Sequence, residues 1–431
     1  MQNRLAKLFL LIFISLSVTV SGQKLIDSPI ARYNLGILEP AGSFRSIAMG
    51  GIGTGLRDNS TIFYTNPASF SAIDTNSFMF DFGMDYGLNN ISDGTSRHSS
   101  DDMNFDHFMI GFPITKGLGF AAGVLPLSNG YYNISETVSE GDPGYDPITG
   151  QYTGYHVGSG NMTNVFVGSG INLTKHISAG INMSVLFGQI TRTNEFVFTD
   201  YYNVYHDNNT STLRLSGINL EYGLQYNTSN KKNHFFDAGL SYSAGKHCKS
   251  DYTNMAVRFT SSSLYDTLNY IADSTSKAYI PGTLRLGVSF GIKNKFTAGL
   301  DYVSTNWSNA KFHGSAGTLR DTRAILFGFE YIPDKFSNYS FLKRIEYRVG
   351  GHIEDNYLVL NGQNIKEWGA SLGFGIPLRR AGLGALSKTN IFFDFTRKSL
   401  ETTTYSHFEN YFTMGASLNF YDFWFVKRKY D

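Results

Sequence analysis

Residues Ser77 to Leu88 read SFMFDFGMDYGL, a stretch that alternates almost without fault between two kinds of side chain. Every second residue from Phe78 to Leu88 is large and apolar, whereas the positions between them hold Asp81, Asp85 and mostly small residues. Because successive side chains of a β-strand point to opposite faces, this pattern predicts a strand with one apolar and one polar face. Such a strand suits a barrel with lipid outside and a polar lumen inside, although a soluble sandwich strand alternates in the same way.

The same alternation returns along the whole chain, and this repetition decides between the two architectures. It predicts about fourteen strands, near 77–88, 104–114, 118–128, 163–173, 177–191, 213–227, 234–245, 280–292, 296–304, 322–332, 344–354, 366–377, 389–397 and 410–421.

The connections between these strands are expected to alternate in length. Short turns fall at 115–117, 174–176, 229–232 and 293–295, with somewhat longer ones near 333–343 and 378–388. The other connections are mostly longer and polar and lie near 89–103, 129–162, 192–212, 246–279, 305–321, 355–365 and 398–409. An even strand number with connections sorted by length is typical of outer-membrane barrels, and soluble sandwiches do not sort their loops in this way. The sequence also has no internal repeat of fixed length, which argues against a propeller or solenoid. We therefore predict an all-β fold, a transmembrane antiparallel β-barrel of about fourteen strands.

The N-terminus has the features of a secretory signal. Arg4 and Lys7 precede a short apolar run, and small residues stand before Gln23. We predict a signal peptide at residues 1–22, an N-terminal hatch or plug at 23–75 and a barrel at 76–431, located in the cell outer membrane.

Composition limits the possible partners. Aromatic residues make up 15% of the chain and charged residues only 16%, with a net charge of +1. A nucleic-acid partner would require a basic surface, so we expect none. We expect contact with outer-membrane lipid, and possible partners are a small hydrophobic ligand and other outer-membrane proteins.

A glycine-rich stretch precedes the first strand. It holds Gly50, Gly51, Gly53 and Gly55 and ends in Asn66-Pro67-Ala68. Glycines at this density allow close backbone approach and positive φ, and its few apolar residues cannot form a core alone. We expect the barrel to be the scaffold that holds this stretch.

These motifs together resemble the FadL-type family of outer-membrane transporters for long-chain fatty acids and other hydrophobic compounds. The residues that carry the resemblance are Ala48 through Gly55, Asn66-Pro67-Ala68, Ile280-Pro281, Leu286-Gly287-Val288, Asp301-Tyr302 and Trp307. The resemblance implies a fourteen-stranded barrel plugged by a hatch of about residues 27–75, and passive uptake of small hydrophobic molecules such as long-chain fatty acids.

The resemblance further implies a hatch or gate at Gly50, Gly51, Gly53, Gly55, Asn66, Pro67 and Ala68. An alternative for Asn66-Pro67-Ala68 is a simple turn from hatch to wall. The connection lengths and the closing residues Trp424 to Asp431 resemble outer-membrane proteins of the Bacteroidota.

If the apolar stripes face lipid, a set of charged residues faces the lumen. These residues are Asp81, Asp85, Glu221, Arg285, Asp301, Glu330, Glu346, Arg348, Glu367 and Asp394. They would form a polar conduit or a docking surface for the hatch, with Arg45 or Arg57 as a further partner. We favour the simpler alternative, an inter-strand network that fills the lumen, because buried charges must be paired.

Catalysis finds little support in the sequence. The ten histidines are scattered, with neither metal-ligand spacing nor a Gly-x-Ser-x-Gly motif. We expect no enzyme activity, no catalytic residues, no metal and no cofactor.

The alternative to uptake is a non-transporting barrel subunit of an outer-membrane secretion or β-barrel assembly machine. The charged lumen and the absence of a clear apolar conduit favour this alternative.

Overall fold

The computed structural model describes residues 28–92, 97–199, 205–260, 265–313, 318–360, 362–378, 387–401 and 406–423. The predicted signal peptide and the closing residues 424–431 lie outside this part of the chain.

The structure is a closed antiparallel barrel of 14 wall strands, which confirms the predicted fold class and strand number. The wall strands are β2 (Ser77–Ser92), β3 (Arg97–Thr115), β4 (Leu118–Asn129), β6 (Tyr152–Asn172), β7 (Ile177–Phe198), β8 (His206–Ser229), β9 (His234–Ser243), β13 (Thr283–Ile292), β14 (Phe296–Thr305), β16 (Thr322–Tyr331), β17 (Glu346–Leu360), β18 (Gln363–Pro377), β19 (Lys388–Glu401) and β20 (Ser406–Phe423). Pairing of β2 with β20 closes the ring.

Shorter elements complete the described part of the chain. The additional strands are β1 (Ile37–Leu38), β5 (Tyr132–Val138), β10 (Lys246–Phe259), β11 (Tyr265–Asp273), β12 (Lys277–Ile280) and β15 (Thr318–Leu319). The helices are η1 (Pro29–Arg32), α2 (Phe44–Ile47), η2 (Pro67–Ala72), η3 (Trp307–Asn309) and η4 (Leu342–Arg344). Within the described residues, no helix has the length and apolar character that crossing a membrane requires.

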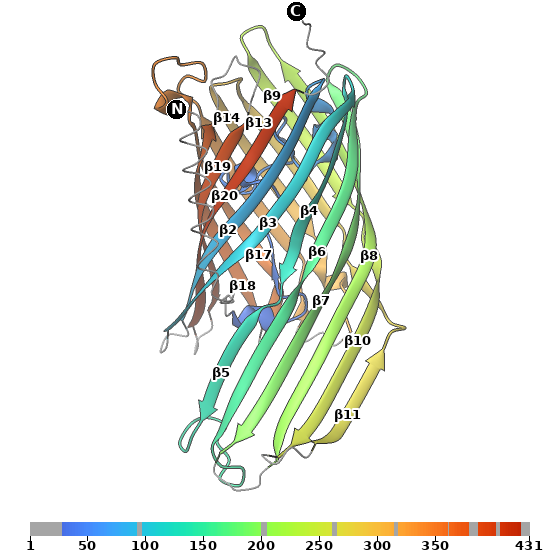
Figure 1. Ribbon diagram of the computed structural model, residues 1–431, viewed down its shortest axis with the longest axis vertical. Coiled ribbons are helices and arrows are strands. Elements are labelled where there is room, and N and C mark those ends of the chain that lie inside the picture. Colours follow the sequence, from blue (N-terminus) through green and yellow to red (C-terminus); the bar gives the residue numbers. More distant parts are fainter. Residues whose placement is uncertain are drawn as a thin grey trace, which may run out of the picture.

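The two ends of the barrel differ. Tight turns at 116–117, 173–176, 230–233 and 293–295 lie at one end, called here the turn end. At the opposite, extended end, one side of the wall continues well beyond the rest, as the lower parts of β5 to β8, β10 and β11 show in Figure 1. In outer-membrane barrels, tight turns face the periplasm and the elaborated end faces outward.

This extension corrects the expected loops at the extended end. We expected irregular connections near 129–162, 192–212 and 246–279, but β5, β10, β11 and long continuations of β6 to β8 occupy most of these residues. The loops near 89–103 and 355–365 are also wrong, because paired strands run through most of both ranges. Apolar side chains in these stretches do not fall on every second outward position, so the stretches lack the continuous apolar stripe that marks a lipid-facing strand.

Side chains sort by face as the alternation predicts. On β7 the outward residues Ile181, Met183, Val185 and Phe187 are all exposed, whereas Asn182 and Ser184 between them are buried. The outward apolar positions form the surface that a bilayer would cover.

Backbone pairing between the neighbouring wall strands β3 and β4 is interrupted. β3 pairs with β4 only from Phe108 to Thr115, and the remainder of β3 pairs with β2 alone. Opposite this free edge, β4 pairs instead with β1, through Ile37 with Asn129 and Leu38 with Ser128. Figure 1 shows β3 and β5 diverging beyond this point. A strand from the N-terminal segment therefore takes the place of a wall neighbour.

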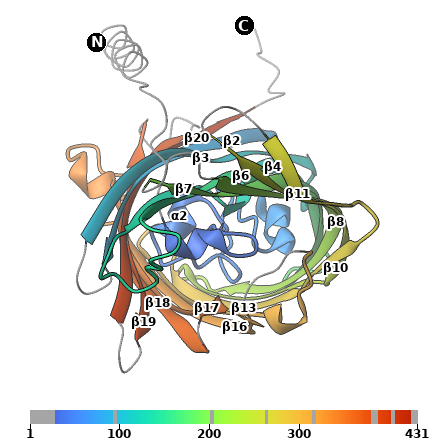
Figure 2. The ribbon, with the colours of Figure 1, turned by 90° about the horizontal axis from the view of Figure 1, so that it is seen from below.

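The N-terminal segment, residues 28–76, lies within the ring of strands, as the view along the barrel in Figure 2 shows. Its residues from Ser43 to Gly50 are all buried. It begins at the extended end, where the Ser28 hydroxyl donates to Glu409 at 2.7 Å, and leads into β2 at the turn end. The segment thus runs through the lumen from one end to the other.

Candidate functional site

The glycine-rich stretch is fastened to the wall through its own backbone. The amide groups of Gly53 and Thr54 both donate to Oδ2 of Asp301 on β14, at 2.8 and 2.7 Å. The amide of Gly50 donates to the Ser371 hydroxyl at 2.9 Å. A buried carboxylate that accepts from consecutive amides forms strong, charge-assisted hydrogen bonds. Asp301 therefore holds the predicted hatch residues and belongs to no ion-pair network among the described residues.

Glycines of the wall face this stretch and permit the contact. Gly50 adopts φ +70°, and a Cβ on it would come within 2.5 Å of backbone atoms of Phe327 and Gly351. A Cβ on Gly239 of β9 would come within 1.9 Å of the Thr54 carbonyl oxygen. Segment and wall pack backbone against backbone, so side chains on either surface would push them apart.

Asn66-Pro67-Ala68 forms a capped turn. The Asn66 side chain accepts from the Ala68 amide at 3.1 Å and so caps η2, while its Nδ2 donates to the carbonyls of Thr54 and Leu224. Pro67 stands at the first helical position, where its missing N–H is no loss. This geometry fits the turn interpretation without any further role.

A buried ion network joins α2 to the turn end of the wall. Arg45 binds Glu330 through two nitrogens, at 2.9 and 3.1 Å, and Asp58 at 3.0 Å. Arg348 contacts Glu330 at 2.7 Å and also pairs with Glu346, which Lys388 approaches at 3.2 Å. Burial opposes every charge here, but the Glu330 and Asp58 carboxylates raise the pKa of Arg45, and Arg45 lowers that of Asp58. The network therefore stays ionised and ties the N-terminal segment to the wall.

Arg57 is held differently. Its guanidinium donates to Ser178, Gln225, Ser71, Asn172 and the Ala68 carbonyl, at distances between 2.9 and 3.2 Å. None of these acceptors is charged, and burial lowers the pKa of Arg57.

The lumenal charges predicted from the sequence divide into separate groups. Glu330, Glu346 and Arg348 form the ion network, and Asp301 binds the glycine-rich stretch. Asp81 lies 3.4 Å from His107, a residue on β3 that also contacts Asp106. The others, Asp85, Glu221, Arg285, Glu367 and Asp394, line a cavity. The expected counter-ion role of Arg285 is not seen, because Arg285 forms no ion pair among the described residues.

This cavity, called here the acidic cavity, has a volume of about 400 Å³ and lies on the extended-end side of the glycine-rich stretch. Its apolar lining comes from Ile47, Leu125, Ile280, Trp307, Leu326 and Phe392, and its carboxylates come mainly from the wall. A space of this size can hold a small organic molecule. Within the described residues, no group of His, Cys, Asp and Glu is arranged to hold a metal ion.

The acidic cavity reaches the break in the wall. Ile37, Leu38, Glu39 and Pro40 line it together with Asn104 and Asp106 of β3 and Leu125 to Leu127 of β4. Residues 36–41, called here the β1 segment, therefore lie between the cavity and the free edge of β3. The amide of Glu39 donates to the Leu127 carbonyl at 3.0 Å, and the Tyr357 hydroxyl donates to the Gly36 carbonyl at 2.6 Å. The β1 segment is thus held in place by a small number of hydrogen bonds.

Glu39 is the charged group of the β1 segment. Burial, with the Asp106 and Asp102 carboxylates of β3, raises its pKa to about 7, although Lys398 opposes this shift. The approach of three carboxylates makes the contact between the β1 segment and β3 sensitive to their ionisation.

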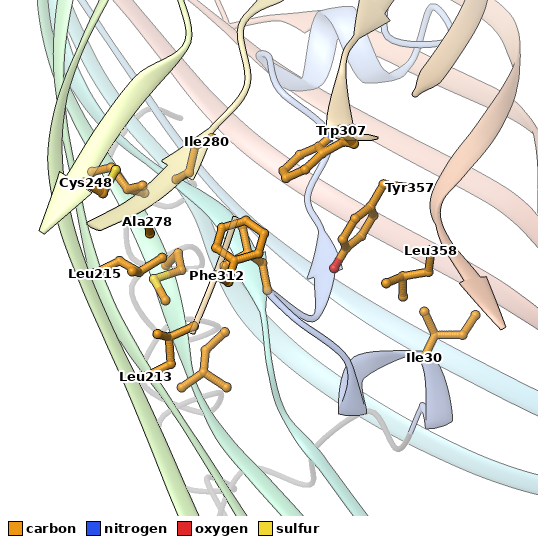
Figure 3. Close-up of a cluster of buried hydrophobic side chains, with 14 of the residues drawn as sticks. Ile30, Leu213, Leu215, Cys248, Ala278, Ile280, Trp307, Phe312, Tyr357 and Leu358 are labelled. Carbon is orange, nitrogen blue, oxygen red and sulfur yellow. The ribbon is translucent and has the colours of Figure 1, made fainter. Parts of the chain in front are cut away.

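An apolar cluster closes the cavity toward the extended end. In Figure 3, Phe312 lies between Leu213, Leu215 and Cys248 on one side and Trp307 and Tyr357 on the other. Ile30 and Leu35 of the N-terminal segment belong to the same cluster. Trp307 and Ile280 also line the acidic cavity, so a molecule in that cavity would touch this cluster.

A second cavity of about 420 Å³, called here the turn-end cavity, lies on the other side of the glycine-rich stretch. Arg57, Asp237, Lys293, Lys295 and Lys335 line it, among others. The packed segment between Gly50 and Ala68 separates the two cavities.

Several site residues were not anticipated from the sequence. Lys388, Asp58 and His107 supply partners for predicted charges, and Glu39 and Glu354 add to the acidic cavity. Glu354 and Lys388 alternate in register with predicted lumenal residues of β17 and β19, so a strict period-two count would have found them. No sequence signal marks Glu39 or Asp58, because neither lies on a strand of the wall.

A family model described as BamG matches residues 5–431. No curated protein sequence matches the chain.

Among solved structures, the chain is similar to the Pseudomonas putida toluene transporter TodX, with 13% identity, a TM-score of 0.58, and coverage of 89% of this chain and 98% of that one. It is also similar to a Pseudomonas aeruginosa FadL homologue (11% identity, TM-score 0.56, coverage 90% and 99%). The Ralstonia pickettii toluene transporter TbuX gives 15% identity, a TM-score of 0.54, and coverage of 90% and 99%. At these identities the likeness shows a shared fold. The resemblance to FadL-type barrels is thus confirmed for the fold, whereas the matching family is a different one.

Proposed function

This chain belongs to the BamG family, and we propose that it is an outer-membrane channel for the passive uptake of small hydrophobic molecules. The neighbours of the same fold are described as a toluene transporter and a monoaromatic hydrocarbon channel, which supports the proposal by analogy. Its location would be the outer membrane, its surroundings lipid, and its action transport without catalysis.

The observation that carries the proposal is the acidic cavity beside the break in the wall. A closed lumen would offer no room for a ligand, but this space is large enough for a small molecule and has an apolar side formed by Trp307, Leu326 and Phe392. It also meets the lipid-facing wall where β3 and β4 are unpaired.

The β1 segment is the element that would move. The rest of the N-terminal segment is packed against wall glycines and fastened by Arg45 and Asp301, so its displacement would break many buried contacts. Only two β1 residues pair with β4, and a few hydrogen bonds hold the remainder. Release of the β1 segment would connect the acidic cavity with the membrane between β3 and β4.

Filling the cavity tests the proposal. Ala324 lines the cavity and is buried, so Ala324→Trp would occupy part of its volume. Ala298→Trp on the lipid side of β14 is the matched control. Uptake of radiolabelled toluene by intact cells should fall with Ala324→Trp nearly to the level of cells that lack the protein, and should persist with Ala298→Trp. Equal uptake by both variants at equal protein levels would overturn the proposal.

A second candidate function is docking to other outer-membrane proteins in a secretion or barrel-assembly machine. Residues 332–345, between β16 and β17, expose Phe336, Tyr339, Phe341 and Leu342 at the turn end, with Tyr339 fully exposed. Adjacent exposed apolar side chains of this kind mark contact surfaces. Purification in mild detergent tests it: a stoichiometric partner that is lost in the double variant Phe336→Ser, Tyr339→Ser would support docking, and a lone barrel would oppose it.

A further inference from the structure

We propose that the acidic cavity selects neutral or positively charged hydrophobic molecules and disfavours carboxylates. This inference rests on the proposed uptake function and specifies the chemistry of its ligand. It follows from the carboxyl groups that line the cavity, from their distribution around it and from two polar oxygens there that have no hydrogen-bond partner.

Carboxyl groups outnumber cations in the cavity. Seven carboxylates line it, against the cations Lys246 and Arg285. Glu367 is paired with Lys398 at 3.2 Å, and Asp106 is paired with His107. The other five, like the two cations, form no ion pair among the described residues; these five are Glu39, Asp85, Glu221, Glu354 and Asp394.

The charges are also unevenly distributed. Asp85, Glu354 and Asp394 lie on β2, β17 and β19, which belong to one continuous arc of the wall, and Glu39 belongs to the β1 segment. Lys246 and Arg285 lie with Glu221 on the opposite side, on β10, β13 and β8. Among the described residues, the arc of the wall that runs from β17 to β2 therefore presents three carboxyl groups that form no ion pair, beside the pair of Glu367 with Lys398.

Two polar side-chain oxygens in the cavity also have no hydrogen-bond partner among the described residues. Thr65 lines the cavity with only 3% of its surface exposed, and its hydroxyl oxygen has no hydrogen-bond partner among the described residues. The same holds for the Oδ1 atom of Asn164, which also lines the cavity. An ammonium or alcohol group supplies the N–H or O–H that the Asn164 oxygen needs, whereas a carboxylate has only lone pairs to offer it. The Thr65 hydroxyl can accept from an ammonium or alcohol group and can also donate to a head group, so it binds a polar head without distinguishing its charge.

The apolar side of the cavity completes the recognition. Ile47, Leu326 and Phe392 provide a surface for a hydrocarbon or aromatic group. A ligand with an apolar body and a neutral or cationic head would thus satisfy both sides, and a carboxylate head would meet like charges in a partly buried space.

A matched set of three ligands tests the inference. 4-Phenylbutylamine, 4-phenylbutanol and 4-phenylbutyrate share one apolar body and carry a positive, neutral or negative head at pH 7.5. Binding to the purified protein in lipid nanodiscs is measured by calorimetry, with empty nanodiscs as the control for partition into lipid. The amine should bind at least tenfold more tightly than the carboxylate, with the alcohol between them or equal to the amine.

Variants assign the preference to the cavity. The double variant Asp85→Asn, Asp394→Asn should reduce the preference for the amine to less than about threefold. Asp237→Asn, in the turn-end cavity, removes one carboxylate elsewhere in the lumen and should leave the preference unchanged. Equal losses in both variants would overturn the assignment.

The outcomes separate this inference from the function on which it rests. Binding of phenylbutyrate as tight as that of the amine, with uptake blocked by Ala324→Trp, would overturn the inference and leave the uptake function standing. Binding of none of the three, with uptake unaffected by Ala324→Trp, would overturn both.

Discussion

Asp301→Asn is expected to loosen the glycine-rich stretch without disturbing the barrel. In the wild type, one carboxylate oxygen accepts from two consecutive amides, at 2.8 and 2.7 Å, and Asp301 is only 2% exposed. Hydrogen bonds to a charged acceptor contribute about 1.5–3 kcal/mol each, and those between neutral groups about 1 kcal/mol. The side-chain amide of the substituted residue has the same shape as the carboxylate and keeps one oxygen as an acceptor. The two hydrogen bonds from Gly53 and Thr54 together should therefore weaken by roughly 2 kcal/mol.

Hydrogen exchange measures this change directly. A loss of roughly 2 kcal/mol in the free energy of local opening corresponds to about 30-fold faster exchange of the Gly53 and Thr54 amides. Asp301→Ala leaves both amides without an acceptor, so its effect should exceed that of Asp301→Asn. Mass spectrometry of peptides covering residues 50–57 reads out the effect, and peptides from β7 report on the barrel itself.

The control is Tyr302→Phe, at the next position, whose side chain is exposed on the outer face. Exchange in residues 50–57 that stays at the wild-type rate in both Asp301 variants would refute the assigned role. Faster exchange that spreads equally to β7 would show instead that Asp301 supports the wall.

Three further predictions concern the N-terminal segment. Arg45→Met removes the closest cation of the half-buried Asp58 and one of the two arginines that pair with the buried Glu330, so urea unfolding should show a loss of about 3–5 kcal/mol, and Arg45→Met with Asp58→Asn should recover part of it; an unchanged midpoint would contradict the network. Gly239→Ala should expose residues 50–57 to protease, because its Cβ would come within 1.9 Å of the Thr54 carbonyl, whereas Gly154→Ala, with no neighbour closer than 3.4 Å, should not. The pKa of Glu39 is raised to about 7 beside Asp102 and Asp106, with Asp85 and Lys398 also near. The closed position of the β1 segment is therefore favoured below pH 7, where Glu39 is protonated, and becomes less stable as the pH rises through 7. Hydrogen exchange of residues 36–41, corrected for its intrinsic pH dependence, should therefore accelerate between pH 6 and 8. The free energy of local opening should fall by an amount on the order of 2 kcal/mol over this range, and Glu39→Gln should remove this dependence.

The fourteen wall strands could be predicted because lipid and lumen impose opposite demands on alternate residues. Phe82 and Asp81 show this plainly, since the first is exposed outward and the second is completely buried. The strands β5, β10 and β11 could not be predicted in the same way. Apolar residues do not alternate regularly with polar ones along them, so no apolar stripe distinguishes them from loops.

The site was predictable in its residue types and not in its pairings. Alternation places Arg348 and Arg285 both in the lumen, but only the fold shows that Arg348 meets Glu330 and Glu346 while Arg285 forms no ion pair among the described residues. The glycines of the first segment are evident in the sequence, yet their partners on the wall, such as Gly239 and Gly350, are separated from them by some 200 to 300 positions. Long-range contacts of this kind leave no local pattern.

A reversible lock on the β1 segment tests whether release of this segment opens the path for uptake. Leu38 and Ser128 are paired across β1 and β4, within the Cα separation that a disulfide spans, so cysteines at both positions in a Cys248→Ala background should bond on oxidation. We expect oxidised cells to lose toluene uptake and to regain it on reduction, while either single cysteine variant transports throughout. Undiminished uptake by the fully oxidised protein would contradict it.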